Sequence, residues 1–188
     1  MMIHFLRHGT TAANEKRLYY GSTDLPLSQR GVEELKRLRE MLPLPAADAH
    51  ITSGMRRTQE TLQLLFNKTP QRTMKELNEY DYGDFEMKCY EELKNDPDYR
   101  RWIAGNDDTP CPNGESQNQF VKRITKGLET IEKMDAESVV VVCHGGVIAT
   151  LMGMLFPGRK QHSYEWVPEC GRGFSVEISG GTFSYTTI

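Results

Sequence analysis

The sequence is poor in cysteine: there are four in 188 residues, and no two are spaced as a CxxC pair. So few cysteines in a chain of this length do not form a disulfide scaffold, and we expect free thiols in a reducing cytoplasm. The first residues, MMIHFLRHGTT, also lack the basic and apolar regions of a signal peptide. A cytoplasmic protein is therefore expected.

An excess of positive charge is also missing, because 23 Lys and Arg stand against 26 Asp and Glu, which gives a net charge of −3. General nucleic-acid binders are usually basic, so we expect no nucleic-acid partner. The uncharged stretch 138–156 is nearly long enough to cross a membrane. Its β-branched run, central His-Gly-Gly and Ala/Leu/Met segment instead indicate a buried strand, a turn and a helix. No membrane partner is expected.

Motifs of several common enzyme classes are absent. The chain has no GxxxxGK[ST] loop, no GxGxxG, no GxSxG and no cysteine six residues before an arginine. His4 and His8 stand four residues apart, but they fall on a strand and at its end rather than on one face of a helix. We therefore expect no metal and no cofactor.

Apolar strands alternate with amphipathic helices along the chain, which is typical of an α/β domain with a mostly parallel sheet between helices, a three-layer sandwich. One domain is expected over 1–188, with an insertion over roughly 80–114 that is rich in Asp, Pro, Tyr and Gly and lies over the active-site edge of the sheet. The expected strands are 2–7, 49–53, 139–143, 174–178 and 182–187, and the expected helices are 28–41, 55–66, 116–131 and 147–156.

Basic and histidine side chains follow three of these strands at the point where each strand ends. They are Arg7 and His8, the pair Arg56-Arg57 after Ser53, and His144 before two glycines. Taken alone, each arginine or histidine in these segments is typical of a solvent-exposed helix surface or of a turn. Because ligands of open α/β sheets bind beyond the carboxyl ends of the strands, the three together favour an anion site that suits a phosphoryl group.

These segments resemble motifs of the histidine phosphatase (phosphoglycerate mutase-like) superfamily. Residues 7–14 read RHGTTAAN and match its RHGxTxxN signature, and 53–57 read SGMRR, in which Arg57 matches the second phosphate arginine. Residues 77–79 read LNE, the segment that carries the family's acid, and 142–146 read VCHGG, its second-histidine motif. The resemblance spans nearly the whole chain.

The resemblance implies a role for each matching residue. His8 would carry the phosphoryl group as phosphohistidine, while Glu79 would protonate the leaving oxygen and then activate water. The oxygens of the phosphoryl group would be held by Arg7, Arg57 and His144. On the substrate side would lie Asn14, Tyr20, Gly21, Tyr82 and Gly145. Three nearby acids remain alternatives to Glu79, namely Glu76, Asp81 and Asp84.

The superfamily includes phosphatases, mutases and members without catalysis. Residues 84–108 hold eight acids against four bases, a balance that should repel polyanions and favours a phosphatase acting on a small phosphorylated metabolite. Residues 20–27, YGSTDLPL, look most like bacterial α-ribazole phosphatases of cobalamin synthesis, so α-ribazole 5′-phosphate is one candidate substrate. The alternatives are a broad-specificity sugar or nucleotide phosphatase, a phosphoglycerate mutase, and an inactive phospho-ligand binding module.

Aromatic residues gather in the insertion and have two interpretations. They either form a surface for a base or sugar of the substrate, or they pack the insertion itself. The residues concerned are Tyr80, Tyr82, Phe85, Tyr90 and Trp102.

Overall fold

The computed structural model describes residues 1–159 and 162–188, and within them six strands form one sheet in the order β3-β2-β4-β1-β5-β6. The strands β3, β2, β4 and β1 run parallel, whereas β5 and β6 run antiparallel to their neighbours. The predicted mostly parallel sheet is thus confirmed. The strands are β1 (Met2–Arg7), β2 (Ala49–Thr52), β3 (Arg72–Thr73), β4 (Ser138–Cys143), β5 (Gly173–Ser179) and β6 (Thr182–Thr187).

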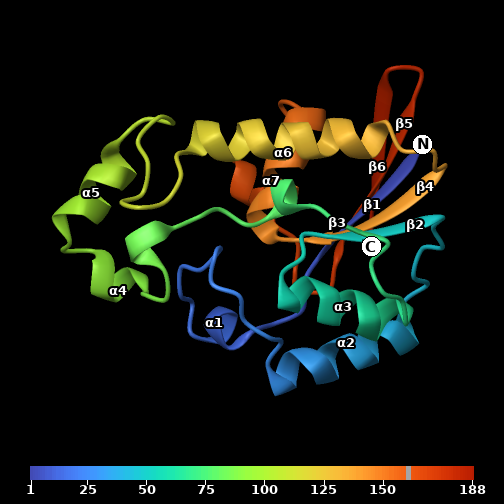
Figure 1. Cartoon of the computed structure of the whole chain (residues 1–188), viewed down its shortest axis with the longest axis horizontal. Helices are drawn as coiled ribbons and strands as arrows, with labels where there is room; N and C mark the ends of the chain where they lie inside the picture. Colours follow the sequence, from blue (N-terminus) through green and yellow to red (C-terminus); the bar gives the residue numbers. More distant parts are fainter. Residues whose placement is uncertain (160–161) are drawn as a thin grey trace.

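Helices cover both faces of the sheet, as Figure 1 shows. The helices α2 (Gln29–Met41) and α3 (Arg56–Phe66) lie on one face, and α6 (Gln117–Glu132) and α7 (Gly145–Leu155) lie on the other. The side chains of β4 alternate between these layers: Val140 and Val142 belong to the same apolar cluster as Leu62, whereas Val139 and Val141 belong to the cluster of α6 and α7. A strand buried on both faces must be apolar throughout, which explains its uninterrupted valine run.

Capping residues set the helix starts that the sequence predicts. The Ser28 hydroxyl accepts from the Gly31 backbone N–H at the start of α2, and Ser116 and Gln119 form a capping box at the start of α6. The helix α7 begins at Gly145 rather than at 147, so His144 is its N-cap residue.

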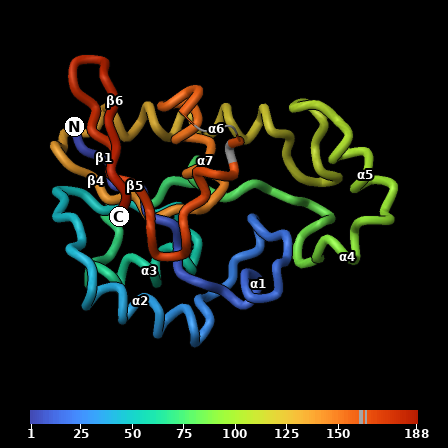
Figure 2. Tube along the Cα trace, turned by 180° about the vertical axis from the view of Figure 1, so that it is seen from behind, coloured from blue at the N-terminus to red at the C-terminus, as the bar shows by residue number. Residues whose placement is uncertain are grey.

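The insertion forms short helices at one end of the molecule (Figures 1 and 2). They are the 3-10 helix η2 (Gly83–Phe85), α4 (Tyr90–Leu93) and α5 (Pro97–Ala104). Their aromatic rings pack on one another: Tyr99 lies 5.4 Å from Phe85 and 5.8 Å from Trp102 between ring centroids. Of the aromatic residues considered from the sequence, Phe85 is buried in this packing, as is Tyr99.

Several short elements were not predicted from the sequence. These are α1 (Ala12–Glu15), β3, and the 3-10 helices η1 (Lys75–Leu77) and η3 (Ser163–Trp166). The predicted hairpin at the end of the chain is present as β5 and β6, and both Gly180 and Gly181 adopt positive φ at its turn. Across the described ranges 1–159 and 162–188, no helix is long and apolar enough to span a bilayer.

Candidate active site

Residues from the end of β1, from the segment after η1 and from the start of α7 surround a cavity of about 450 Å³. The cavity lies at the carboxyl edge of the parallel strands, where ligands of α/β sheets bind. Nine further residues join His8, Glu79 and Gly145 in its lining: Arg7, Asn14, Arg17, Leu18, Tyr19, Tyr20, Tyr82, Gly146 and Val167. Arg57 and His144 lie behind His8 and do not line this cavity.

His8 is held as a neutral ring with one free nitrogen. Its exposed fraction is 3%, and its Nδ1–H donates to the Gly9 carbonyl at 2.7 Å. That bond places the ring proton on Nδ1 and leaves the lone pair on Nε2, which lies 3.5 Å from the Tyr20 hydroxyl. Burial, with the positive charges of Arg57 and Arg7, lowers the pKa of His8 well below its usual value. The ring is therefore available as a nucleophile near neutral pH.

Arg7 offers an unpaired donor beside this ring. Its Nη1 donates to the Pro168 carbonyl at 2.9 Å, whereas its buried Nε has no hydrogen-bond partner among the described residues. A buried N–H of a cation without a partner is costly, so the site is prepared for an anion. Glycine at 145 leaves the approach open, because a Cβ there would lie 3.2 Å from Arg7 Nε.

Arg57 is fully buried and is held by backbone carbonyls. Its Nη2 donates to Gly21 at 2.8 Å, its Nη1 to Thr23 at 2.9 Å, and its Nε to His144 Nδ1 at 3.3 Å. A guanidinium has five N–H groups, so two remain for a ligand. Gly21 therefore positions Arg57 and does not itself line the cavity.

His144 is buried with both ring nitrogens engaged. Nδ1 accepts from Arg57, so the ring proton is on Nε2, which donates to the Ser53 hydroxyl at 2.8 Å. Burial and the charge of Arg57 lower the pKa of His144 well below its usual value. Its ring centroid lies 5.3 Å from that of His8. Contact of His144 with a phosphoryl oxygen requires one of these hydrogen bonds to be exchanged, so this role stays a prediction.

Glu79 is fixed at the opposite wall by two backbone donors. Its Oε1 accepts from the Tyr80 N–H and its Oε2 from the Gly146 N–H, both at 2.9 Å. A Cβ at position 146 would lie 2.4 Å from Glu79 Oε1, so the close approach requires glycine. The alternatives Glu76, Asp81 and Asp84 do not line the cavity.

Asn14 is oriented toward the cavity by its own turn. Its Oδ1 accepts from the Thr11 backbone N–H at 3.0 Å and from the Tyr20 hydroxyl at 2.8 Å. The amide NH₂ is thereby left as a donor for a substrate.

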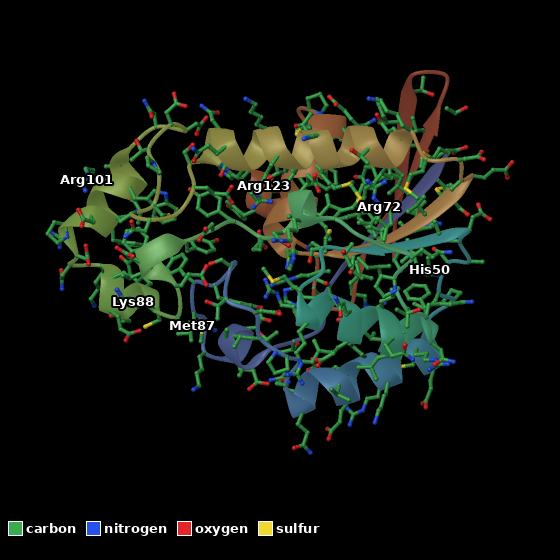
Figure 3. All side chains as sticks on the ribbon, in the orientation of Figure 1. His50, Arg72, Met87, Lys88, Arg101 and Arg123 are labelled. Atoms are coloured by element: carbon green, nitrogen blue, oxygen red, sulfur yellow. The ribbon has the colours of Figure 1, made fainter. Side chains whose placement is uncertain are left out.

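Two positioning residues were missed from the sequence. Arg123 on α6 lies on the side that faces the sheet (Figure 3) and donates to the carbonyls of Asn78 at 2.6 Å and Glu79 at 2.7 Å. Glu86 accepts from the backbone N–H groups of residues 21–23, the loop that holds Arg57. The one available signal for Arg123 was a charged residue next to the apolar face of a predicted helix.

Within the described part of the chain, no three His, Cys, Asp or Glu side chains are grouped to hold an ion. His4 Nδ1 instead lies 2.8 Å from the Ser175 hydroxyl.

Comparisons with known proteins find phosphatases and phosphoglycerate mutases that are similar to this chain. The family model of the histidine phosphatase superfamily (branch 1) matches residues 3–182. The adenosylcobalamin/alpha-ribazole phosphatase of Salmonella typhimurium is 27% identical over 186 residues, which covers 96% of this chain and 92% of that protein. A 2,3-bisphosphoglycerate-dependent phosphoglycerate mutase of Methylorubrum extorquens is 30% identical over 162 residues, 79% of this chain and 76% of the mutase. The crystal structure of the alpha-ribazole phosphatase from Shigella flexneri superposes with a TM-score of 0.86 at 26% identity, over 100% of this chain and 96% of that one.

Proposed function

The chain belongs to branch 1 of the histidine phosphatase superfamily, and from this we propose that it hydrolyses phosphomonoesters through a phosphohistidine on His8. One observation carries the proposal. The Gly9 carbonyl fixes the ring proton on Nδ1, so that the Nε2 lone pair lies in the cavity beside an unpaired Arg7 N–H. A nucleophile next to a prepared anion site is what phosphoryl transfer requires.

In the first step, His8 Nε2 forms a bond to phosphorus while the bond from phosphorus to the ester oxygen breaks. Charge accumulates on the phosphoryl oxygens, where Arg7 Nε donates to them and the positive charge of Arg57, behind His8, acts at longer range. Glu79 donates a proton to the leaving oxygen, which departs as an alcohol.

In the second step, a water molecule attacks the phosphohistidine. The Glu79 carboxylate accepts a proton from this water, the bond from nitrogen to phosphorus breaks, and inorganic phosphate and the free ring are formed. The arginines supply the positive charge throughout, and no step of the scheme requires a metal ion.

We further propose α-ribazole 5′-phosphate as a substrate. The names of relatives similar to this chain over nearly its full length support this choice. The mutase relative supports phosphoglycerate mutation as the second candidate. Against it, Tyr82 is what the described part of the insertion contributes to the wall of this cavity, and it offers no cation for a substrate carboxylate.

Trapping the intermediate tests the scheme. The protein is mixed briefly with a phosphomonoester, quenched without acid and digested, and the peptide that contains His8 is expected to be heavier by one phosphoryl group. His8→Ala should lose both this label and turnover. The matched control is His4→Ala, which replaces a buried histidine of β1 outside the cavity and should keep both. Turnover by a folded His8→Ala protein would overturn the proposal.

A further inference from the structure

A second cavity of about 290 Å³ adjoins the first beyond Glu79. The two share four lining residues, Glu79, Tyr82, Gly146 and Val167. Its volume is near the lower end of small-molecule sites, roughly 300 Å³. The remaining lining residues come from the insertion, α6, α7 and the η3 region: Tyr80, Trp102, Gln117, Phe120, Ala149, Thr150 and Tyr164.

The walls of this second cavity are aromatic and almost uncharged. Glu79 is the one charged residue among the described lining residues, and it lies on the wall shared with the first cavity. Gln117 and Thr150 add an amide and a hydroxyl to these walls. Flat rings with a few polar atoms suit such a surface, whereas an anion would meet a carboxylate and no cation among the described lining residues.

The position of Glu79 orients a substrate across the two cavities. A proton from Glu79 reaches the leaving oxygen only if that oxygen lies near the shared wall, with the phosphoryl group on the His8 side. We infer that the second cavity is the leaving-group subsite and that it binds an uncharged aromatic group, such as the base of a nucleoside monophosphate or an aryl ring. This inference rests on the proposed phosphatase function, and it specifies the chemical class of the leaving group for which the site is selective.

The aromatic wall is preformed, which makes it suited to recognition. Trp102 Nε1 donates to the Tyr80 hydroxyl at 3.4 Å, and that hydroxyl donates to the Glu115 carbonyl. The Tyr82 ring packs on Tyr80 with centroids 5.0 Å apart. Tyr164 differs, because it comes from η3 rather than from the insertion and is 68% exposed. A ring entering the subsite thus meets a fixed wall and one adaptable side chain.

Three alkyl phosphates test the subsite: methyl, benzyl and 4-carboxybenzyl phosphate. All three need a proton from the same acid, and they differ in the size and charge of the leaving group. The kcat/KM of the parent protein should be at least about tenfold higher for benzyl than for methyl phosphate, and 4-carboxybenzyl phosphate should fall below benzyl phosphate. Equal values for methyl and benzyl phosphate, or a preference for the carboxylate, would overturn the inference.

Variants locate the effect. Tyr164→Ala should lower the ratio of benzyl to methyl turnover by about two- to tenfold, the worth of one aromatic contact, whereas Tyr90→Ala, outside the cavity, should not change it. Gln117→Lys should raise kcat/KM for 4-carboxybenzyl relative to benzyl phosphate more than Asn118→Lys does, since only position 117 lines the cavity. A Tyr164→Ala ratio equal to that of the parent, or equal effects of the two lysine variants, would contradict the assignment.

The same assay separates the two proposals. If no ester releases phosphate, the phosphatase function fails and the subsite fails with it. If release depends on His8 but shows no preference for the benzyl group, the phosphatase function stands and the subsite assignment is wrong.

Discussion

Two neighbouring histidines in this protein are held in opposite tautomers by their hydrogen-bond partners. The Gly9 carbonyl can only accept, so His8 carries its proton on Nδ1, while the Arg57 guanidinium can only donate, so His144 carries its proton on Nε2. Both rings are neutral because burial beside arginines disfavours a further positive charge. The His8 ring therefore has a free lone pair on Nε2. The His144 ring instead links Arg57 to Ser53 through its two hydrogen bonds.

At the residue scale, replacing Glu79 tests the acid. Glu79→Gln keeps the size of the side chain and removes the proton, so turnover of alkyl phosphates should fall by roughly 10²–10⁴. The leaving group of p-nitrophenyl phosphate needs little protonation, so its single-turnover phosphorylation of His8 should fall less. Rapid quench of both substrates measures this, and Glu76→Gln, three residues away and outside the cavity, is the matched control. Equal losses for the two substrates would assign the proton to another group.

The segment that carries Glu79 follows η1 and is held by Arg123 of helix α6. Arg123 binds the backbone of residues 76–79 and pairs with Glu115, whose Oε1 also accepts from the Asp81 N–H at 2.8 Å. The insertion contributes the equivalent restraint on Arg57 through Glu86 and the loop at 21–23. Both contacts run from a charged side chain to backbone, so each fixes a segment rather than a single side chain.

Arg123→Gln should therefore impair both stability and catalysis. The half-buried guanidinium makes several charged hydrogen bonds, and their loss should cost about 1–3 kcal/mol in the free energy of unfolding. Because Glu79 would be less well placed, single-turnover phosphorylation of His8 should slow more with alkyl phosphates than with p-nitrophenyl phosphate. Urea unfolding and rapid-quench kinetics measure the two effects. Lys126→Gln, the same charge loss on an exposed face of α6, should show neither.

At this scale the sequence predicts the long elements and misses the short ones. α6 carries an apolar pattern long enough to show its helical period, and β1 and β4 are apolar runs whose ends place His8 and His144. The two residues of β3 are too few for any period, and α1 depends on a capping box between Thr11 and Asn14. Glu86 and Arg123 left no motif because they bind backbone N–H and carbonyl groups, which residues provide whatever their side chain, proline's missing N–H apart.

Across the whole molecule, the buried histidines couple folding to pH. His8 and His144 have lowered pKa values in the folded protein, whereas in the unfolded chain they titrate near the ordinary value of about 6.5. Above pH 6.5 neither state binds these protons, so they contribute no pH dependence. Below it the unfolded state binds more protons than the folded state, and stability falls as the pH falls.

Urea unfolding at pH 7.5 and pH 5.5 should show this loss. Each histidine contributes at most about 1.4 kcal/mol per pH unit, so a fall of roughly 1–3 kcal/mol is expected between the two conditions. His8→Gln, which has no titrating ring, should show a smaller fall than the parent protein. A free energy of unfolding that is unchanged or higher at pH 5.5 would show that these rings are protonated in the folded state.

The charges around the cavities bear on whether a phosphohistidine would transfer its phosphoryl group to water, as in a phosphatase, or back to the bound substrate, as in a mutase. The acids of the insertion are mostly used locally: Asp96 caps α5, and Asp98 pairs with Arg101 at the far end of the molecule (Figure 3). What faces the two cavities from the insertion is Tyr80, Tyr82 and Trp102. A mutase must retain a bisphosphorylated intermediate and exclude water from His8, which takes cations around the substrate. Among the described residues lining the two cavities, Arg7 and Arg17 are the cations.

We therefore expect the phosphohistidine to react with water. With 3-phosphoglycerate and 2,3-bisphosphoglycerate as primer, formation of 2-phosphoglycerate should be negligible beside phosphate release from a monoester with a neutral aromatic leaving group. Both products are measured in one reaction, and His8→Ala gives the background. If 2-phosphoglycerate accumulates faster than phosphate is released from any monoester, the two arginines suffice to hold the bisphosphate and the chain is a mutase. A neutral aromatic wall disfavours mutase activity. A bisphosphorylated intermediate loses hydrogen bonds to water when it binds, and the aromatic side chains supply no positive charge to replace them.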